Sequence, residues 1–133
     1  MSFCTVINCI DGRVQLPVIT FLQNRFGVEY VDVVTEAGPV GILSQRTESS
    51  DAKSIFRRVE VSILAHFSQV MSVVAHHDCA GNPVSDSKQK RQLRICLEIL
   101  SQRYPRMEVV GLWLDQNWAV HASSLAAKKR EEH

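Results

Sequence analysis

A short apolar run at residues 70–75 (VMSVVA) gives way abruptly to the polar, glycine-containing sequence HHDCAG at residues 76–81. A run of this length that ends in polar residues and glycine is typical of a buried strand leading into a loop. Residues 3–9 (FCTVINC) are also short, apolar and rich in β-forming side chains, and they end at IDGR, residues 10–13. The sequence therefore predicts two buried central strands, each followed by a loop that carries polar side chains.

Two helices are predicted between these strands. The first has Pro17 in its first turn and Gly27 as its C-terminal cap. The second begins at Ser49 or Ser50, either of which can cap it, and runs to about Phe67. Its predicted apolar face consists of Ile55, Phe56, Val59, Ile63, Leu64 and Phe67.

A third helix is predicted to open with a capping box at residues 86–89 (DSKQ) and to end before Pro105. Residues 29–35 and 107–114 are predicted to be two further strands, and residues 118–121 can add a short strand at one edge. The inward-facing side chains of the third helix are expected to be Leu93, Ile95, Cys96, Leu97, Ile99 and Leu100.

Strands that alternate with helices predict an α/β fold with a central, mainly parallel sheet of four strands, helices on both faces and a short fifth edge strand. The glycine- and proline-bearing segment 36–50 is expected to be a loop. Residues 1–127 are expected to form a single domain, and residues 128–133 (KKREEH) a charged C-terminal tail.

Length and charge limit the partners of the chain. Its 133 residues are enough for one domain with a hydrophobic core. Its formal net charge of +1 argues against binding to nucleic acid or a membrane surface, because neither basic nor acidic residues predominate. We find neither an apolar run of about 18 residues nor a signal peptide. The four cysteines are then expected to be thiols or metal ligands, in a cytoplasmic protein that acts on a small-molecule substrate.

His76 and Cys79 form one half of a candidate metal site, because imidazole nitrogen and thiolate sulfur are ligands of tetrahedral zinc. Cys9 ends the first predicted strand. If that strand lies beside the one that ends at His76, both strand ends face the same crevice. The cofactor is then predicted to be Zn²⁺, with three protein ligands and an open fourth position, which is the pattern of a catalytic zinc site.

Each of these residues also has a simpler interpretation when it is taken alone. Cys9 and Cys79 could be inert buried thiols, and His76 could be a structural histidine at a strand end. Asp11 and Arg13 could be an ordinary ion pair in a loop. Their joint occurrence after two predicted strands favours the metal site.

Five other residues are expected to have roles outside the metal site. His77 could act as a proton shuttle because imidazole titrates near neutrality, although a solvent-facing role is the simpler expectation. Cys4 and Cys96 are assigned to the core. Trp113 and Trp118 are expected to pack against the last strand or at an interface.

The two motifs together resemble those of the β-class carbonic anhydrases, whose pattern is Cys-x-Asp-x-Arg followed tens of residues later by His-x-x-Cys. CIDGR at residues 9–13 and HHDC at residues 76–79 occur in this order. Residues 36–38 (EAG) are similar to the family's Ala-Gly loop, and residues 107–112 to its final strand. The resemblance and the strand–helix alternation together predict the spatial strand order 2-1-3-4.

The resemblance implies that Cys9, His76 and Cys79 are zinc ligands and that Asp11 and Arg13 are a catalytic dyad. It also implies a homo-oligomer, most simply a dimer, because the family's site lies at a subunit boundary. The sequence opens directly on its first predicted strand, whereas the family usually has an N-terminal helical extension before that strand. Three further departures are Gly12 in place of a common serine, Pro39 in place of asparagine, and Ala80 in place of glycine.

The expected reaction is the reversible hydration of carbon dioxide to bicarbonate by zinc-bound hydroxide. Asp11 would accept a hydrogen bond from the zinc-bound water and orient it, and Arg13 would keep Asp11 ionised through a two-pronged ion pair. Asp11 could instead bind the zinc and close the site.

Other functions remain open at this point. The same zinc chemistry could hydrolyse carbonyl sulfide or carbon disulfide, or the protein could bind zinc without turnover. A cysteine redox role is more distant, because the sequence has no Cys-x-x-Cys pair.

Overall fold

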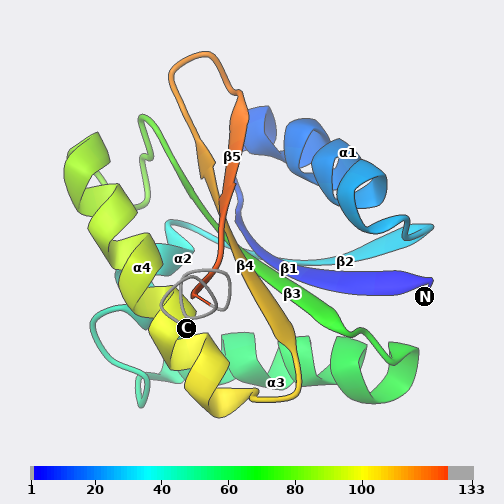
Figure 1. Cartoon of the computed structure of the whole chain (residues 1–133). Helices are drawn as coiled ribbons and strands as arrows, with labels where there is room; N and C mark the ends of the chain where they lie inside the picture. Colours follow the sequence, from blue (N-terminus) through cyan, green and yellow to red (C-terminus); the bar gives the residue numbers. More distant parts are fainter. Residues whose placement is uncertain (1, 126–133) are drawn as a thin grey trace, which may run out of the picture.

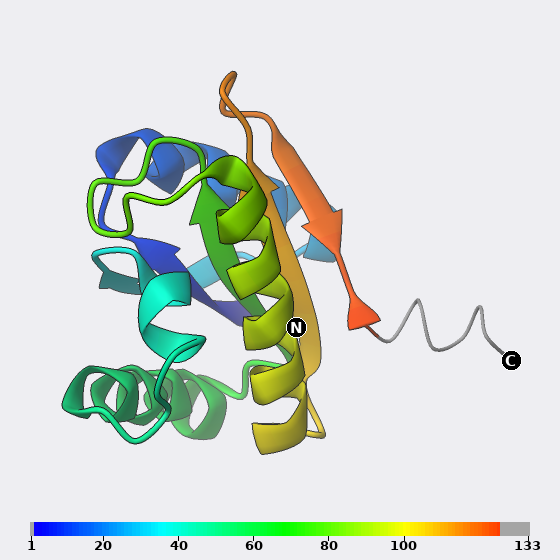
Figure 2. The same ribbon diagram turned by 90° about the vertical axis from the view of Figure 1, so that its left-hand side faces the viewer.

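The computed structural model describes residues 2–125, which form a five-stranded sheet in the order β2-β1-β3-β4-β5 (Figure 1). The strands are β1 (Phe3–Cys9), β2 (Tyr30–Glu36), β3 (Val70–His76), β4 (Glu108–Leu114) and β5 (Val120–Ser123). β1 to β4 are parallel, and β5 pairs antiparallel with β4 at one edge (Figure 2). The predicted α/β class and the strand order 2-1-3-4 are confirmed. The predicted tail at 128–133 and the domain boundary at 127 lie outside the described residues.

β1 and β3 are the buried centre of the sheet. Every residue of β3 is buried, as is every residue of β1 after Phe3. Successive side chains of a strand point to opposite faces, so Val6 and Ile7 enter two different core clusters. Because both faces are covered, these strands are almost continuously apolar in sequence rather than alternating.

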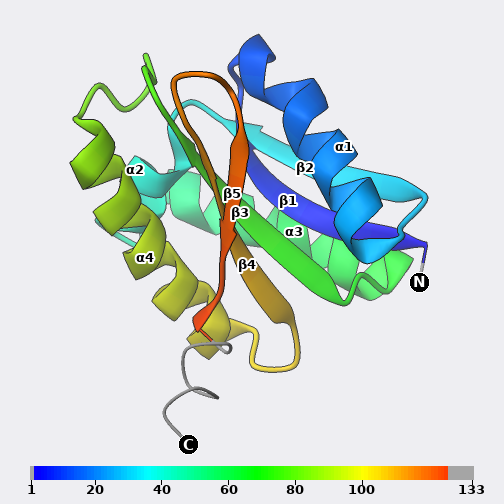
Figure 3. The same ribbon diagram turned by 45° about the horizontal axis from the view of Figure 1, so that its top comes forward.

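Helices cover both faces of the sheet, as Figure 3 shows with α1 in front of β1 and β2 and α3 behind them. Val18 and Leu22 of α1 pack in the cluster that contains Val6, whereas residues of α2, α3 and α4 pack in the cluster that contains Ile7. Among the described residues, no helix is both long and apolar enough to cross a membrane. The helical elements are the single turn η1 (Gly12–Val14), α1 (Gln15–Phe26), α2 (Pro39–Leu43), α3 (Ser50–His66) and α4 (Asp86–Arg103).

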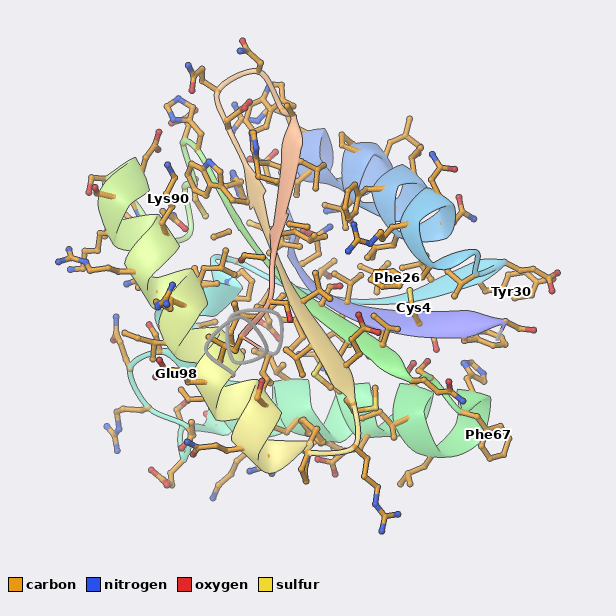
Figure 4. All side chains as sticks on the ribbon, viewed as in Figure 1. Cys4, Phe26, Tyr30, Phe67, Lys90 and Glu98 are labelled. Carbon is orange, nitrogen blue, oxygen red and sulfur yellow. The ribbon has the colours of Figure 1, made fainter. Side chains whose placement is uncertain are left out.

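The apolar face of α3 is shorter than the sequence predicts. Ser49 caps the helix by accepting a hydrogen bond from the amide of Ala52 at 3.2 Å, which agrees with the predicted start. Leu64 and Phe67, however, are 74% and 77% exposed, so their assignment to the buried face is wrong. Phe67 takes a left-handed conformation at the C-terminal cap (φ 57°) and points away from the sheet (Figure 4).

Four other predictions are also corrected. The expected loop 36–50 contains the short helix α2, which begins at Pro39 because proline is favoured in a first turn. The N-terminal cap of α4 is Ser85 rather than Asp86, and Ile95 on that helix is 42% exposed. The fifth strand begins two residues later than predicted, at Val120.

Candidate metal centre

The carboxyl ends of β1 and β3 bring three potential metal ligands together. The two strands pair directly, Cys9 and His76 are their last residues, and Cys79 lies in the loop that follows β3. One ligand atom of each residue lies within 4.8 Å of the others, and the two Sγ atoms are 3.8 Å apart. All three residues are buried. This Cys9–His76–Cys79 group has the size and composition of a site that could hold a metal ion.

The imidazole of His76 is oriented so that its Nε2 atom could bind a metal ion. Its Nδ1 donates a hydrogen bond to the carbonyl oxygen of His77 at 2.7 Å, so Nε2 carries the free lone pair. Nε2 is buried and has no hydrogen-bond partner within the described residues. A buried polar atom without a partner costs about 1–3 kcal/mol, and a metal ion bound at Nε2 would remove that penalty.

The two thiols are strongly coupled. A hydrogen bond from Cys79 lowers the pKa of Cys9 despite burial, and the same contact raises the pKa of Cys79. The pair therefore holds one proton more tightly than the other, as expected of two acids in contact. Binding of a divalent cation to both sulfurs displaces the remaining proton. This donor set fits a thiophilic ion such as Zn²⁺.

Asp11 and Arg13 form a complete ion pair beside this group. Both carboxylate oxygens of Asp11 accept hydrogen bonds from the Arg13 guanidinium, at 3.1 Å and 2.7 Å, and Oδ1 also accepts the Arg13 amide at 2.9 Å. These contacts lower the pKa of Asp11 to about 2. Within the described residues, the group whose ligand atoms lie close enough together to hold a metal ion consists of Cys9, His76 and Cys79, and Asp11 is not part of it.

Arg13 links the two loops that build the centre. Besides Asp11 in the loop after β1, it donates to the carbonyl oxygen of Asp78 at 3.0 Å and to its carboxylate at 3.3 Å, in the loop after β3. The indole of Trp118 covers the guanidinium, with 4.4 Å between the Arg13 Cζ atom and the ring centroid. Trp118 packs within the site, which its predicted role in strand or interface packing did not anticipate.

The loop that carries Cys79 is fastened by buried amides that the sequence analysis missed. Asn82 donates to Oε1 of Gln92 at 2.7 Å, and Gln89 donates to the carbonyl oxygen of Asn82 at 2.9 Å. Gln89 and Gln92 are 1% and 6% exposed on α4. In the sequence, these two glutamines lie three positions apart next to the predicted apolar face of the helix. That spacing was the available signal for a pair of polar contacts on the inner side of the helix.

The Ala-Gly loop after β2 packs against the same segment. Gly38 has φ 66°, and a Cβ atom there would lie 2.6 Å from the Cβ atom of Asn82. At Gly81 a Cβ atom would lie 2.6 Å from the Ala37 carbonyl carbon. These glycines are needed because the two loops approach more closely than side chains allow.

The remaining residues of interest lie outside the three-residue group. His77 pairs with Asp86 through Nδ1 at 2.9 Å and is half-exposed, which leaves its shuttle role untested. Cys4 and Cys96 are buried, and burial raises the pKa of their thiols to about 11 and about 12. Figure 4 shows Cys4 between the sheet and the end of α1.

Comparisons with known proteins place this chain in a family. The sequence matches the family model described as "Putative carbonic anhydrase" over residues 1–124. Among curated proteins, no sequence matches the chain.

Solved structures with a similar fold agree with this match. One is a β-carbonic anhydrase of the filamentous ascomycete Sordaria macrospora, described as tetrameric, with 12% identity and a TM-score of 0.54 over 89% of this chain and 79% of the other. Another is the β-carbonic anhydrase CcaA, with 13% identity and a TM-score of 0.54 over 96% of this chain and 82% of the other. At these identities the likeness concerns the fold. The chain therefore belongs to the family of putative carbonic anhydrases and has the fold of the β-carbonic anhydrases.

Proposed function

We propose that the protein is a zinc-dependent carbonic anhydrase that interconverts carbon dioxide and bicarbonate, with Cys9, His76 and Cys79 as the zinc ligands. The observation that carries this proposal is the buried Nε2 of His76, which has no hydrogen-bond partner within residues 2–125 and belongs to a group with two thiol sulfurs. Membership of the carbonic anhydrase family supports the choice of carbon dioxide as substrate.

Zinc bound by one imidazole and two thiolates would supply a Lewis acid that lowers the pKa of a water ligand. Asp11 accepts a hydrogen bond from the attacking water and fixes the direction of its lone pair. Since Arg13 holds the pKa of Asp11 at about 2, this carboxylate stays ionised and unable to donate a proton throughout the neutral range. Its acceptor role is therefore independent of pH near neutrality.

Arg13 also supports an open fourth position. Both carboxylate oxygens of Asp11 accept hydrogen bonds from the Arg13 guanidinium, a two-pronged contact that we call the fork. The fork fixes the direction of the carboxylate. A turn of Asp11 toward the metal would weaken these hydrogen bonds. The arrangement thus favours Asp11 as a partner of the water over Asp11 as a ligand of the ion.

The test combines metal analysis with stopped-flow CO2 hydration. We expect about one zinc per chain, with activity that rises between about pH 6 and about pH 9 as the water ionises. Asp11→Asn should keep the zinc and lose most of the turnover, whereas Asp51→Asn, at an exposed position in the first turn of α3, should change neither. Zinc-loaded protein without CO2 hydration would overturn the proposal, and hydrolysis of carbonyl sulfide or carbon disulfide by that protein would reassign the substrate.

We further propose that the protein works as a homo-oligomer, a dimer or a larger assembly. Ile10 and Leu16, just before and just after η1, are 66% and 73% exposed beside the loop that carries Asp11 and Arg13. Large apolar side chains exposed next to a site favour an interface. Sedimentation should give a mass above the 15.0 kDa of one chain, and the double variant Ile10→Lys/Leu16→Lys should shift it toward the monomer. A wild-type monomer at micromolar concentration would contradict this.

A further inference from the structure

Backbone strain among the described residues is concentrated around Arg13. Outside glycine, only Phe67, Asp78 and Trp118 have positive φ in the described part of the chain, with φ 56° at Asp78 and φ 63° at Trp118. For a bulky aromatic residue such a conformation is a genuine outlier. Asp78 and Trp118 come from different loops, yet both contact the Arg13 guanidinium. Strained residues that persist in this way are held by their surroundings and often serve a site.

The turn between β4 and β5 holds Trp118 in this conformation. Asp115 accepts hydrogen bonds from the amides of Asn117 and Ala119 through Oδ1, at 2.8 Å and 3.2 Å, and its carbonyl oxygen accepts the amide of Trp118 at 2.9 Å. Its other carboxylate oxygen bonds Nε2 of His121 at 2.7 Å. A single residue, Asp115, therefore ties the turn together and holds the backbone of Trp118 in its left-handed conformation.

The indole is close both to Arg13 and to the Cys9–His76–Cys79 group. The Arg13 Cζ atom is 4.4 Å from its centroid, the His76 ring centroid is 6.1 Å away, and the indole packs against the core cluster that includes Cys9 and Cys79. The guanidinium thus has Asp11 and Asp78 as hydrogen-bond partners and the aromatic ring as its stacking partner.

The two ion pairs of Arg13 differ in strength. The Asp11 side chain is 17% exposed and makes a two-pronged contact, whereas Arg13 and Asp78 are 46% and 71% exposed, so water competes for the Asp78 pair and it contributes little. A cation–π contact with a partly buried tryptophan is not replaced by water in the same way. The stacking therefore adds to the Asp11 contact in keeping the guanidinium in one position.

From these contacts we infer that Trp118 is a positioning residue: its indole holds Arg13 so that Asp11 stays off the metal and the fourth position stays open. This inference rests on the proposed zinc site. Without the indole, Arg13 gains freedom, its fork on Asp11 loosens, and the carboxylate can turn to the metal. The effect is on the coordination of the ion rather than on the fold.

The test uses cobalt-substituted protein, because the visible absorption of Co²⁺ reports its ligands without any need for turnover. Trp118→Leu, which keeps apolar bulk but removes the π face, should change the spectrum and lower CO2 hydration by roughly five- to thirtyfold. Trp118→Phe, which keeps a π face, should restore most of both. Trp113→Phe, at the cation–π contact with Lys90 on α4, is the matched control and should leave the spectrum unchanged.

A second comparison separates positioning from general damage. In an Asp11→Asn background, Trp118→Leu should leave the cobalt spectrum unchanged, because the carboxylate that would bind the ion is gone. A wild-type spectrum in Trp118→Leu, or an equal spectral change in the Asp11→Asn background, would overturn the inference. If wild-type protein binds cobalt but does not hydrate CO2, the proposed function fails while the spectra still decide the role of Trp118.

Discussion

The sulfur atoms of Cys9 and Cys79, seventy residues apart in the chain, lie 3.8 Å from each other. They meet because β1 and β3 are adjacent parallel strands whose carboxyl ends lie at the same edge of the sheet. The contact lowers the pKa of one thiol and raises that of the other, so the pair is poised to exchange a proton for a cation.

Cys79→Ser should therefore abolish stoichiometric zinc binding, since a hydroxyl is a poor substitute for a thiolate ligand. Cys96→Ser, which changes another buried thiol that donates to the Val40 carbonyl oxygen at 3.7 Å, should keep about one zinc per chain. Metal analysis of the two purified variants after dialysis makes the comparison. Full zinc content in Cys79→Ser would contradict the assignment of the ligands.

Arg13→Ala should retain zinc and lose most of the CO2 hydration, because Asp11 loses the fork that directs its carboxylate. Arg13→Lys should recover only part of the activity, since an ammonium cannot make the same bidentate contact. Stopped-flow assays with parallel metal analysis measure both properties. Activity of Arg13→Ala within about twofold of the wild type would show that the fork is dispensable.

The meeting of Cys9, His76 and Cys79 could be predicted because each residue ends or follows a short apolar run that is typical of a buried strand. Adjacent parallel strands bring their carboxyl ends together. The strand order follows from the strand–helix alternation together with the resemblance to the β-class carbonic anhydrases, and the structure confirms it. Only the start of the edge strand β5 differs, by two residues.

What could not be predicted depends on the local geometry of helix ends and on contacts between distant segments. Asp86 looked like a helix cap, but Ser85 caps α4 and the Asp86 carboxylate pairs with His77 instead. Phe67 fits the apolar spacing of α3 but lies past the last helical turn, where the left-handed cap turns it outward. The stacking of Trp118 on Arg13 joins a turn near the C-terminal end to the first loop, and no spacing rule connects them.

Gln92→Leu should lower the free energy of unfolding by about 1–3 kcal/mol, because it leaves the buried amide of Asn82 without its acceptor. Gln102→Leu, at an exposed position on the same helix, is the control and should stay within about 0.5 kcal/mol of the wild type. Urea denaturation of the zinc-free proteins gives both values. Equal stability of the two variants would mean that the amide contact does not secure the loop.

Gly38→Ala should be more damaging than the same change at two other glycines. At Gly38 the backbone has φ 66° and a Cβ atom would lie 2.6 Å from Asn82, so both strain and overlap oppose it. Gly27→Ala meets only the strain of φ 65°, expected to cost about 1 kcal/mol, and Gly12→Ala meets neither. Thermal unfolding should rank the melting temperatures Gly12→Ala, Gly27→Ala, Gly38→Ala from highest to lowest. Any other order would indicate that the loops are not packed as closely as the structure shows.

The last prediction concerns the acid stability of the turn that carries Trp118. The hydrogen bond from His121, followed by those from the amides of Asn117 and Ala119, holds the pKa of Asp115 below its ordinary value of 3.8. A lowered folded-state pKa contributes stability that is present above about pH 3.8 and is lost as the pH falls through the folded value.

Asp115→Asn provides the comparison, since its amide oxygen can still accept from the two backbone amides while the charge toward His121 is removed. We expect the wild type to be the more stable protein above about pH 5 and the difference to shrink steadily below about pH 4. Urea unfolding of both proteins at a series of pH values measures this difference. If the difference stayed constant or grew on acidification, the ionised carboxylate of Asp115 would not be what stabilises the turn.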